Sequence, residues 1–394
     1  MPSGEVSARD RAPAWLPEVP GILTAQDILA TGLSIAATQQ PHGAIGWPDG
    51  HVDAWNHVEC AMAVSACGLR DAARRAYGWL RAAQRPDGSW PRTTTAGIVT
   101  DHAAESNQVA YPAVGVWHEF LVTGDEAFAA AMWPVVRRAT EYVLGLQTAR
   151  GELAWERTAD GAAGRYALLA GCASACQSLR CAIALAEHMA EPQPDWELAA
   201  DRLGHVVACH PEAFADKSRF SMDWYYPVLG GPVRGSAGRE RLAAGWDVFV
   251  VPGLGARCVS DQPWVTGAES CELVLALDSV GQRDRAADLF TEIQHLRDPL
   301  GGYWTGWQYV NQAHFPAEQS SWTAAAIILA ADALSGATGG AGIFRNGAGR
   351  WPAASTADAA VAGRWAGAVA ADVITVDAVC GCAPPGPPLP RSAG

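Results

Sequence analysis

The chain has 394 residues, of which 49% are hydrophobic and 18% are charged, so it can bury a substantial core and is not disordered by composition. Its formal net charge is −13 and it has no run of Lys and Arg, which argues against nucleic-acid phosphates and anionic membrane surfaces as partners. No basic and apolar leader opens the chain, and no segment reaches the roughly 18 apolar residues of a membrane span, so we expect a cytoplasmic protein.

A short motif recurs along the chain, in which an amphipathic stretch ends in Gln or Arg, a turn with Gly follows, and a Trp comes next. It occurs as QQPHGAIGW at 39–47, QRPDGSW at 84–90, QTARGELAW at 147–155 and RDPLGGYW at 297–304. Each copy predicts the end of a helix, a turn, and an aromatic side chain that packs against the next layer. The recurrence indicates a fold built from repeated helical units.

Two kinds of helix alternate around these motifs. Those with one charged face are expected on the outside, near 24–39, 71–84, 127–147, 195–209, 239–246 and 283–297. Those that are apolar nearly all round are expected inside, near 55–67, 105–122, 168–188, 223–235, 264–280 and 319–335. The alternation predicts an all-α fold, an (α/α)6 toroid of helical hairpins closed around one central pocket.

No interior linker divides the chain, so we expect one large toroid domain at 24–335. An N-terminal extension would occupy 1–23. The tail at 336–394 is rich in Gly, Ala and Pro, which predicts partial disorder. In a concentric barrel all outer-to-inner connections emerge at one end, and function is expected in those loops, around the mouth of the pocket.

These connections are dense in aromatic, acidic and amide side chains, whereas the inner-to-outer turns are short. Flat rings stack on sugar faces, and acids, amides and Arg bind hydroxyls, so the pocket suits a small-molecule carbohydrate substrate. The alternative is that the Trp side chains only fill the core, and we expect this of at least half of the 17. The expected substrate-binding residues are Trp47, Asp49, His51, Asp53, Trp55, Glu105, Gln108, Trp155, Asp223, Trp224, Tyr225, Arg257, Trp264, Trp304, Trp307 and Gln319.

Metal and cofactor sites are not predicted. Asp49, His51, Asp53 and His57 could hold a metal ion, but such a loop mixture is more typical of a hydrogen-bonded sugar subsite or a helix cap.

Inverting glycoside hydrolysis needs one protonated carboxyl as acid and one ionised carboxyl that activates water, roughly 6.5–9.5 Å apart. Glu156 follows Trp155 in an apolar stretch, so burial is expected to raise its pKa and make it the acid. Glu318 precedes the last inner helix, whose N-terminus favours the ionised form of a base.

Each catalytic assignment has a structural alternative. Glu156 could instead form a salt bridge with Arg157 or Arg165. Glu318 could cap the helix that follows, a role for which the next two serines compete.

Two segments carry a resemblance to the glucoamylase-like family 15 glycoside hydrolases. LAWERTADG, followed by an Ala-rich inner helix, resembles the general-acid segment after that family's fifth helix, and places Glu156 as the acid. AEQSSWTAAAIILA resembles the segment between its helices eleven and twelve, and places Glu318 as the base. The resemblance covers about 24–335 and implies inverting hydrolysis of a small glycoside or oligosaccharide. The family's Arg-Asp pair is matched only loosely, by GWPDGHVDAW, and its bacterial β-sandwich domain is missing.

Another resemblance leads to a different chemistry. QRPDGSW resembles the repeat of terpenoid cyclases and protein prenyltransferases, which implies an isoprenoid substrate in an aromatic cavity. The D-x-D-D acid of class II cyclases is absent from the sequence, however, and a turn with a Trp plug explains the motif structurally. A third possibility is a non-catalytic carbohydrate-binding toroid.

Overall fold

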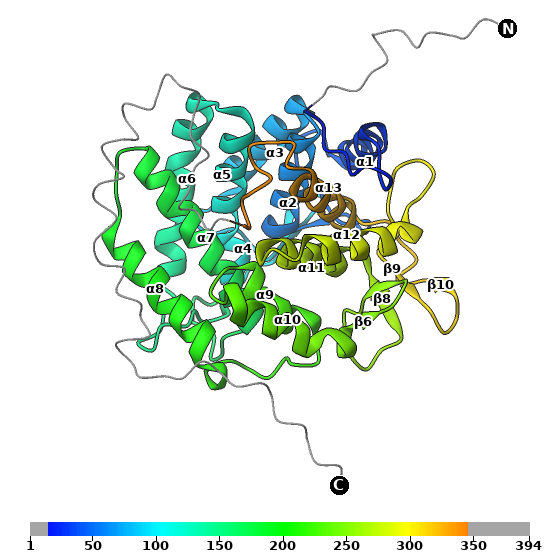
Figure 1. Cartoon of the computed structure of the whole chain (residues 1–394). Helices are drawn as coiled ribbons and strands as arrows, with labels where there is room; N and C mark the ends of the chain where they lie inside the picture. Colours follow the sequence, from blue (N-terminus) through cyan, green and yellow to red (C-terminus); the bar gives the residue numbers. More distant parts are fainter. Residues whose placement is uncertain (1–14, 346–394) are drawn as a thin grey trace, which may run out of the picture.

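The structure is a computed structural model that describes residues 15–345, in which helices alternate between two concentric rings (Figure 1). The inner ring consists of α2 (Ala54–Ala66), α4 (Ser106–Ala110) with α5 (Pro112–Thr123), α7 (Leu169–His188), α9 (Ser221–Leu229), α11 (Gly267–Ser279) and α13 (Ser321–Ser335). The outer ring consists of α1 (Ala25–Thr38), α3 (Arg70–Ala83), α6 (Glu126–Leu144), α8 (Pro194–Cys209), α10 (Gly235–Phe249) and α12 (Arg283–Glu292). The predicted (α/α)6 toroid is confirmed.

The inner ring is closed, because each inner helix packs against the next in the order α2, α5, α7, α9, α11, α13, and α13 returns to α2. The sequence explains which helices lie inside. Nearly every residue of α13, SWTAAAIILAADALS, is buried, since its small and apolar side chains leave no polar face. In α3, by contrast, only one stripe is buried, and its Arg and Asp side chains lie on the other face.

The recurring Gln of the sequence motif joins one hairpin to the next. The side-chain Nε2 of Gln39 donates hydrogen bonds to the carbonyl oxygens of Gly43, in its own turn, and Ala72, in the next outer helix. Gln84 donates in the same way to Gly88 and Val135. The motif therefore has the structural role of a turn that holds neighbouring outer helices together.

The Gly of the motif allows the close approach that this bonding needs. Gly88 has φ +93°, and a Cβ added to it would overlap the carbonyl oxygen of Arg138 in the next outer helix. Gly301, in the last copy, has φ +98° and lies against Ala30 of α1, where an added Cβ would come within 2.7 Å of the Ala30 carbonyl carbon. Because this last contact falls on the first helix, the same motif that joins successive hairpins also closes the ring.

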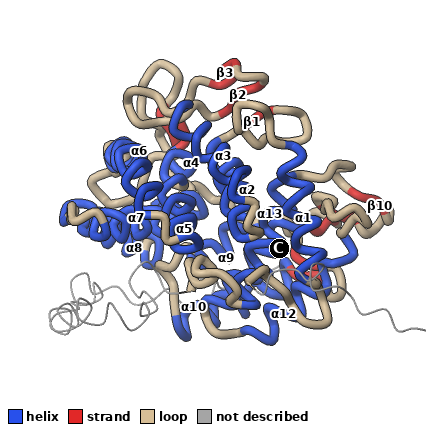
Figure 2. Tube along the Cα trace, turned by 90° about the horizontal axis from the view of Figure 1, so that it is seen from above, coloured by secondary structure: helices blue, strands red, loops and turns tan. Residues whose placement is uncertain are grey.

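The outer-to-inner connections contain short β-strands. The sheets are β1 (His51–Val52) with β2 (Thr93–Thr95) and β3 (Ile98–Asp101); β4 (Ala104–Glu105) with β5 (Glu156–Arg157); β6 (Val250–Val251) with β7 (Gly255–Ala256); and β8 (Trp264–Thr266) with β9 (Gly306–Gln308) and β10 (Ala313–His314). Figure 2 shows β1, β2 and β3 gathered at one end of the helices. Since all of these strands precede inner helices, they surround the inner-helix N-termini, which we call the mouth of the barrel.

Residues on both flanks of the expected domain pack on the barrel. Leu16, Val19 and Leu23 are buried before α1, and Ile343 and Phe344 are buried beyond α13. Parts of the predicted extension and tail thus pack on the barrel, and the remainder of both lies outside the described residues 15–345. One described helix, α7, has the length and apolarity of a membrane span, and 78% of its apolar window is buried inside the ring.

Candidate active site

Asp53 holds the first carboxyl at the mouth of the barrel. It is the N-cap of α2, is 4% exposed, and accepts hydrogen bonds from the backbone N–H of Asn56 at 2.9 Å and from Trp47 Nε1 at 2.8 Å. The Asn56 side-chain amide donates a third at 2.6 Å. Both oxygens of Asp53 therefore accept hydrogen bonds at the positive end of the helix dipole.

Glu105 and Glu156 are cross-strand neighbours in the β4–β5 pair, so their side chains share one face of that ladder. Glu105 is 9% exposed, and burial, helped by the charge of Asp53, raises its pKa to about 8, although Arg92 acts in the opposite direction. A carboxyl with such a pKa carries its proton at neutral pH. Glu105 is therefore poised as a proton donor.

Glu156 lies beside Glu105 in a different electrostatic environment. Its carboxylate forms an ion pair with Arg92, which also contacts Asp101 at 2.9 Å. Glu156 therefore does form a salt bridge, as the structural alternative expected, but its partner is Arg92 of the second outer-to-inner connection. Arg157 instead donates to the carbonyl of Gly161. Glu156 therefore has a cationic partner in the folded protein, and its role as the acid stays a prediction.

Across the ring from Glu105 lies Glu269, a residue that the sequence analysis did not single out. It occupies the first turn of α11 and is 5% exposed. In the closed ring, α5 packs between α2 and α7, and α11 between α9 and α13, so α5 and α11 lie on opposite sides. Neighbouring helix axes are roughly 8–10 Å apart, which puts opposite axes of such a ring roughly 16–20 Å apart.

Glu318 lies in the connection before α13, and that connection is opposite the one that carries Glu156, because α7 and α13 are opposite in the ring. Ser320 caps α13 by accepting a hydrogen bond from the Thr323 N–H at 3.1 Å, so capping does not occupy Glu318. Glu318 is half-buried. The two acids proposed from the sequence therefore also come from opposite sides of the mouth.

Several buried polar atoms near the mouth have no hydrogen-bond partner among the described residues. They come from the inner helices' first turns and the residues next to them: Trp55 Nε1, Asn56 Oδ1, Asn107 Oδ1, Gln108 Oε1, Ser221 Oγ, Trp264 Nε1, Thr266 Oγ1 and Thr305 Oγ1. Leaving such a group unsatisfied costs roughly 1–3 kcal/mol. Donors and acceptors of this kind around the mouth suit a ligand with many hydroxyl groups.

Aromatic rings form one wall of this region. The ring of Trp55 lies 5.2 Å from that of Tyr111 and 5.7 Å from that of Trp322. Trp47 continues the wall, with its ring 5.8 Å from Trp322 and stacked on His51. These rings offer flat apolar faces next to the orphaned polar atoms, which is the combination that a sugar ring requires.

At the rim of the mouth, several residues that were expected to bind substrate contact other aromatic rings. Trp304 stacks on His314 at 4.2 Å with Trp307 edge-on to the same imidazole, and Trp264 lies against Phe315. The remaining expected residues at the rim are Asp49 and His51, which bond each other, Trp155 over Gly171, Arg257 bonded to Tyr309, and exposed Gln319 beside Gly302. They surround the mouth without being buried in it.

On α9 the expectations need correction. Trp224 donates from Nε1 to the carbonyl of Arg241 at 2.8 Å and stacks on Phe249 at 5.3 Å, so it packs between α9 and α10 and is a core residue. Tyr225 is fully buried and its hydroxyl donates to Glu272, deeper in the barrel than the mouth. Asp223 does lie near the mouth, where burial raises its pKa to about 6.

The His and Asp side chains of the first outer-to-inner connection form hydrogen bonds to other groups of the protein. His57 is buried, accepts at Nδ1 from the Ile45 N–H at 3.1 Å, and lies with Nε2 3.0 Å from the Ala76 carbonyl oxygen, to which it donates. Between residues 15 and 345, no group of three or more His, Cys, Asp or Glu side chains is arranged to hold a metal ion.

Comparison with known proteins places these features in context. A curated relative from Mycolicibacterium hassiacum, MMP endo-(1,4)-3-O-methyl-alpha-D-mannosidase, is 54% identical over 331 residues, which cover 84% of this chain and 92% of the relative. A glycosidase of known structure superposes with a TM-score of 0.64 at 13% identity, over 79% of this chain and 98% of that chain. A D-mannose isomerase reaches a TM-score of 0.61 at 11% identity, over 78% and 95%. No protein-family model matches the chain.

Proposed function

This chain belongs to the family of MMP endo-(1,4)-3-O-methyl-alpha-D-mannosidase, a glycoside hydrolase, and we propose that it hydrolyses internal (1,4) linkages of a 3-O-methylated α-mannoside with inversion. Its fold is that of a glycosidase-like toroid, and its substrate is a carbohydrate. The observation that supports hydrolysis most directly is the presence of buried carboxyls on opposite sides of the ring, with Glu105 on one side and Glu269 on the other.

Glu105 is proposed as the general acid. Its pKa of about 8 keeps the carboxyl protonated at neutral pH, so it can donate its proton to the glycosidic oxygen as the C1–O bond breaks. Burial is the main cause of that raised pKa, and the nearby charge of Asp53 adds to it. The same negative charge would stabilise the oxocarbenium-like transition state at C1.

Glu269 is proposed as the general base. It would take a proton from a water molecule, whose oxygen attacks C1 on the face opposite to the departing sugar, and so inverts the anomer. Opposite helix axes lie roughly 16–20 Å apart, and two side chains that reach inward leave a gap of the order that inversion requires, roughly 6.5–9.5 Å. The orphaned polar atoms at the mouth would bind the sugar hydroxyls, and the Trp55 wall would contact the methylated ring.

Glu156 and Glu318 form the second candidate pair. They come from the connections in which the glucoamylase-like family carries its acid and base, and those connections are also opposite each other. Against this pair, Glu156 is already engaged in the ion pair with Arg92, and both side chains are less buried than Glu105 and Glu269. On the first assignment, these two carboxylates bind sugars that flank the cleaved bond.

The chain's predicted isoprenoid alternative has weaker support. The QRPDGSW motif that suggested it has a structural role in joining hairpins, through Gln84 and Gly88. The mouth is also rich in polar atoms, whereas a polyene would require a mostly apolar cavity.

The deciding experiment incubates the full chain with a 3-O-methylated α-(1,4)-mannan oligosaccharide and follows the anomer of the new reducing end by NMR. We expect an inverted product, and a fall in kcat of roughly 10²–10⁴-fold in Glu105→Gln and in Glu269→Gln. Glu141→Gln, at an exposed site on α6, is the matched control and should keep full activity.

Two results would change the proposal. If Glu156→Gln and Glu318→Gln abolish turnover while Glu105→Gln and Glu269→Gln do not, the second pair replaces the first. If the unmodified chain cleaves neither this oligosaccharide nor its unmethylated counterpart, the proposed hydrolysis is wrong.

A further inference from the structure

Glu59 lies on the same face of α2 as Trp55, one helical turn further from the mouth. The two residues are four positions apart, the spacing at which helical side chains lie one above the other. Glu59 is 4% exposed, and among residues 15–345 it forms no ion pair with Arg, Lys or His. No step of the proposed hydrolysis uses this buried carboxyl.

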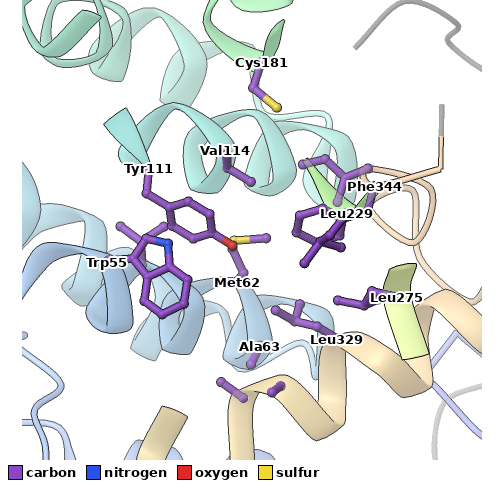
Figure 3. Close-up of a cluster of buried hydrophobic side chains, with 14 of the residues drawn as sticks. Trp55, Met62, Ala63, Tyr111, Val114, Cys181, Leu229, Leu275, Leu329 and Phe344 are labelled. Atoms are coloured by element: carbon purple, nitrogen blue, oxygen red, sulfur yellow. The ribbon is translucent and has the colours of Figure 1, made fainter. Parts of the chain in front are cut away.

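Tyr111 connects this carboxyl to the aromatic wall of the mouth. Its ring lies 5.2 Å from that of Trp55, and its hydroxyl donates a hydrogen bond of 2.8 Å to Glu59 Oε1. Figure 3 shows the ring of Tyr111 beside that of Trp55, with the hydroxyl directed away from the indole. One tyrosine side chain therefore spans a turn of α2, with its ring against Trp55 and its hydroxyl on Glu59.

The acceptor at Glu59 selects the position of the Tyr111 ring. Tyr111 lies at the junction of α4 and α5, directly before Pro112, and is buried. A buried hydroxyl without a partner costs roughly 1–3 kcal/mol, so the ring is held where its hydroxyl reaches Glu59. Trp322 of α13 contacts Trp55 with its ring centre 5.7 Å away. Tyr111 and Trp322 together therefore set the orientation of Trp55.

The orientation of Trp55 matters because its indole N–H is available to a ligand. Trp55 Nε1 is buried and has no hydrogen-bond partner in the described part of the chain. A small rotation of the ring would change the direction of this donor and of the flat face beside it. The hydrogen bond between Tyr111 and Glu59 thus controls a group that faces the substrate without itself touching it.

This role requires Glu59 only as a hydrogen-bond acceptor. Burial raises the pKa of its carboxyl, and the charge of Asp53 adds to this, while the hydrogen bond from Tyr111 acts in the opposite direction. The protonated form that burial favours needs no counterion and still accepts a hydrogen bond. A glutamine side chain offers an acceptor oxygen of the same geometry, and a leucine side chain offers none.

We propose that Glu59 is a positioning residue for substrate binding, which holds Tyr111, and through Tyr111 the ring of Trp55, in the orientation that contacts the sugar. The inference rests on the proposed function, which assigns Trp55 to contact with the substrate. Loss of this positioning should raise KM and leave kcat unchanged, because the proton transfers are assigned to Glu105 and Glu269, which belong to other elements.

The first test removes the hydroxyl and keeps the ring. Steady-state kinetics of Tyr111→Phe on a 3-O-methylated α-(1,4)-mannan oligosaccharide should show KM raised about three- to fivefold, the value of one hydrogen bond, with kcat unchanged. Tyr226→Phe is the matched control, since Tyr226 is also buried and donates to the buried Glu272 at 2.6 Å. It should keep the parent KM. An unchanged KM in Tyr111→Phe, or an equal rise in both variants, would overturn the proposal.

Variants of Glu59 test the other end of the same hydrogen bond. Glu59→Leu should raise KM as Tyr111→Phe does, and should add nothing to it in the double variant, because both changes break one interaction. Glu59→Gln keeps the acceptor and should restore the parent KM. If the Gln and Leu variants have the same KM, the carboxyl has only a packing role and the proposal is wrong. If Glu59→Leu does not fold, Tyr111→Phe beside Glu59→Gln decides.

Binding measurements separate this inference from the proposed hydrolysis. If the unmodified chain binds the oligosaccharide without cleaving it, the hydrolysis fails, and titration calorimetry of the same variants tests Glu59 through Kd. If the chain cleaves the oligosaccharide but neither KM nor Kd responds to Tyr111→Phe, the inference about Glu59 fails alone. A chain that neither binds nor cleaves it overturns both.

Discussion

Glu105 and Glu156 face each other across the β4–β5 pair, and the guanidinium of Arg92 bonds Glu156 while Glu105 remains buried beside it. Two carboxyls one strand apart thereby lie in different electrostatic environments: burial raises the pKa of Glu105, whereas Glu156 has a cationic partner.

The fall of kcat/KM at alkaline pH should follow the loss of the proton from Glu105. Because its pKa is about 8 in the folded protein, the acid is present below that pH and is lost as the pH rises through it. We expect kcat/KM to fall about tenfold for each pH unit above 8. Initial rates on a soluble oligosaccharide between pH 5 and 10 check this, and a rate that stays constant up to pH 10 would exclude Glu105 as the acid.

Removing Arg92 should shift the alkaline decrease of kcat/KM to higher pH. Arg92 lowers the pKa of Glu105, so Arg92→Gln is expected to raise it and to shift the alkaline limb upward by about half a unit to one unit. The control is Arg137→Gln, which removes an exposed cation paired with Glu141 on α6 and should leave the profile in place. A downward shift in Arg92→Gln would mean that another group sets the limb.

Trp55 and Trp90 provide a matched test of substrate contact. Trp55 Nε1 is buried and has no hydrogen-bond partner among residues 15–345, whereas Trp90 Nε1 donates to the Leu80 carbonyl at 2.9 Å. Trp55→Phe should raise KM about five- to tenfold, the value of one hydrogen bond to substrate, with little loss of stability. Trp90→Phe should leave KM unchanged and lower the free energy of unfolding by about 1–2 kcal/mol. Steady-state kinetics and urea unfolding of both variants distinguish the two roles, and the reverse pattern would refute them.

The motif glycine can be tested by stability alone. Gly88→Ala introduces a Cβ that overlaps the Arg138 carbonyl oxygen in a left-handed backbone, and we expect it to lower the free energy of unfolding by about 2–4 kcal/mol. Gly78→Ala, in the exposed middle of α3, meets no neighbouring atom and should raise it by about 0.5–1 kcal/mol. Chemical denaturation measures both, and similar effects at the two positions would show that the motif does not depend on close approach.

His57 should make the fold sensitive to acid. Burial lowers its pKa to about 4, below the ordinary His value of 6.5, so the unfolded chain binds a proton that the folded chain does not. The contribution of neutral His57 to the free energy of unfolding is fully present above pH 6.5. It is lost as the pH falls toward 4, by about 1.4 kcal/mol per pH unit. Urea unfolding at pH 7 and pH 5 should show a smaller loss in His57→Gln than in the parent chain. An equal loss in both would assign the acid sensitivity to other groups.

The helical frame could be predicted from the sequence because each ring has its own pattern. One charged face, as in α3, indicates an outer helix, and an all-apolar segment, as in α13, indicates an inner one. The recurring motif of Gln or Arg, a Gly-containing turn and Trp indicated where one helical hairpin connects to the next. The order of these elements then fixed which end of the barrel carries the mouth.

The interior of the site could not be predicted in the same way. Glu59, Glu269 and Glu272 occur within apolar helices, where sequence does not show that an isolated acid faces the axis of a ring. The available signal was their presence in segments that otherwise exclude charge. The Arg92 ion pair depends on β4 and β5, which are two residues long and too short to show alternation. Trp224 was misplaced because adjacency to a loop does not reveal to which side of α9 a ring turns.

The contact of Gly301 with Ala30, together with the 2.5 Å ion pair between Arg297 and Asp27, has a consequence for how the molecule comes apart. An open array of helical repeats frays from its two terminal units, which each lack one neighbour. A closed array has no terminal unit, so no hairpin can detach without breaking interfaces on both sides. Loss of structure must begin with a rupture somewhere in the circle, and the seam between the first and last hairpins is as much a part of its cooperativity as any other joint.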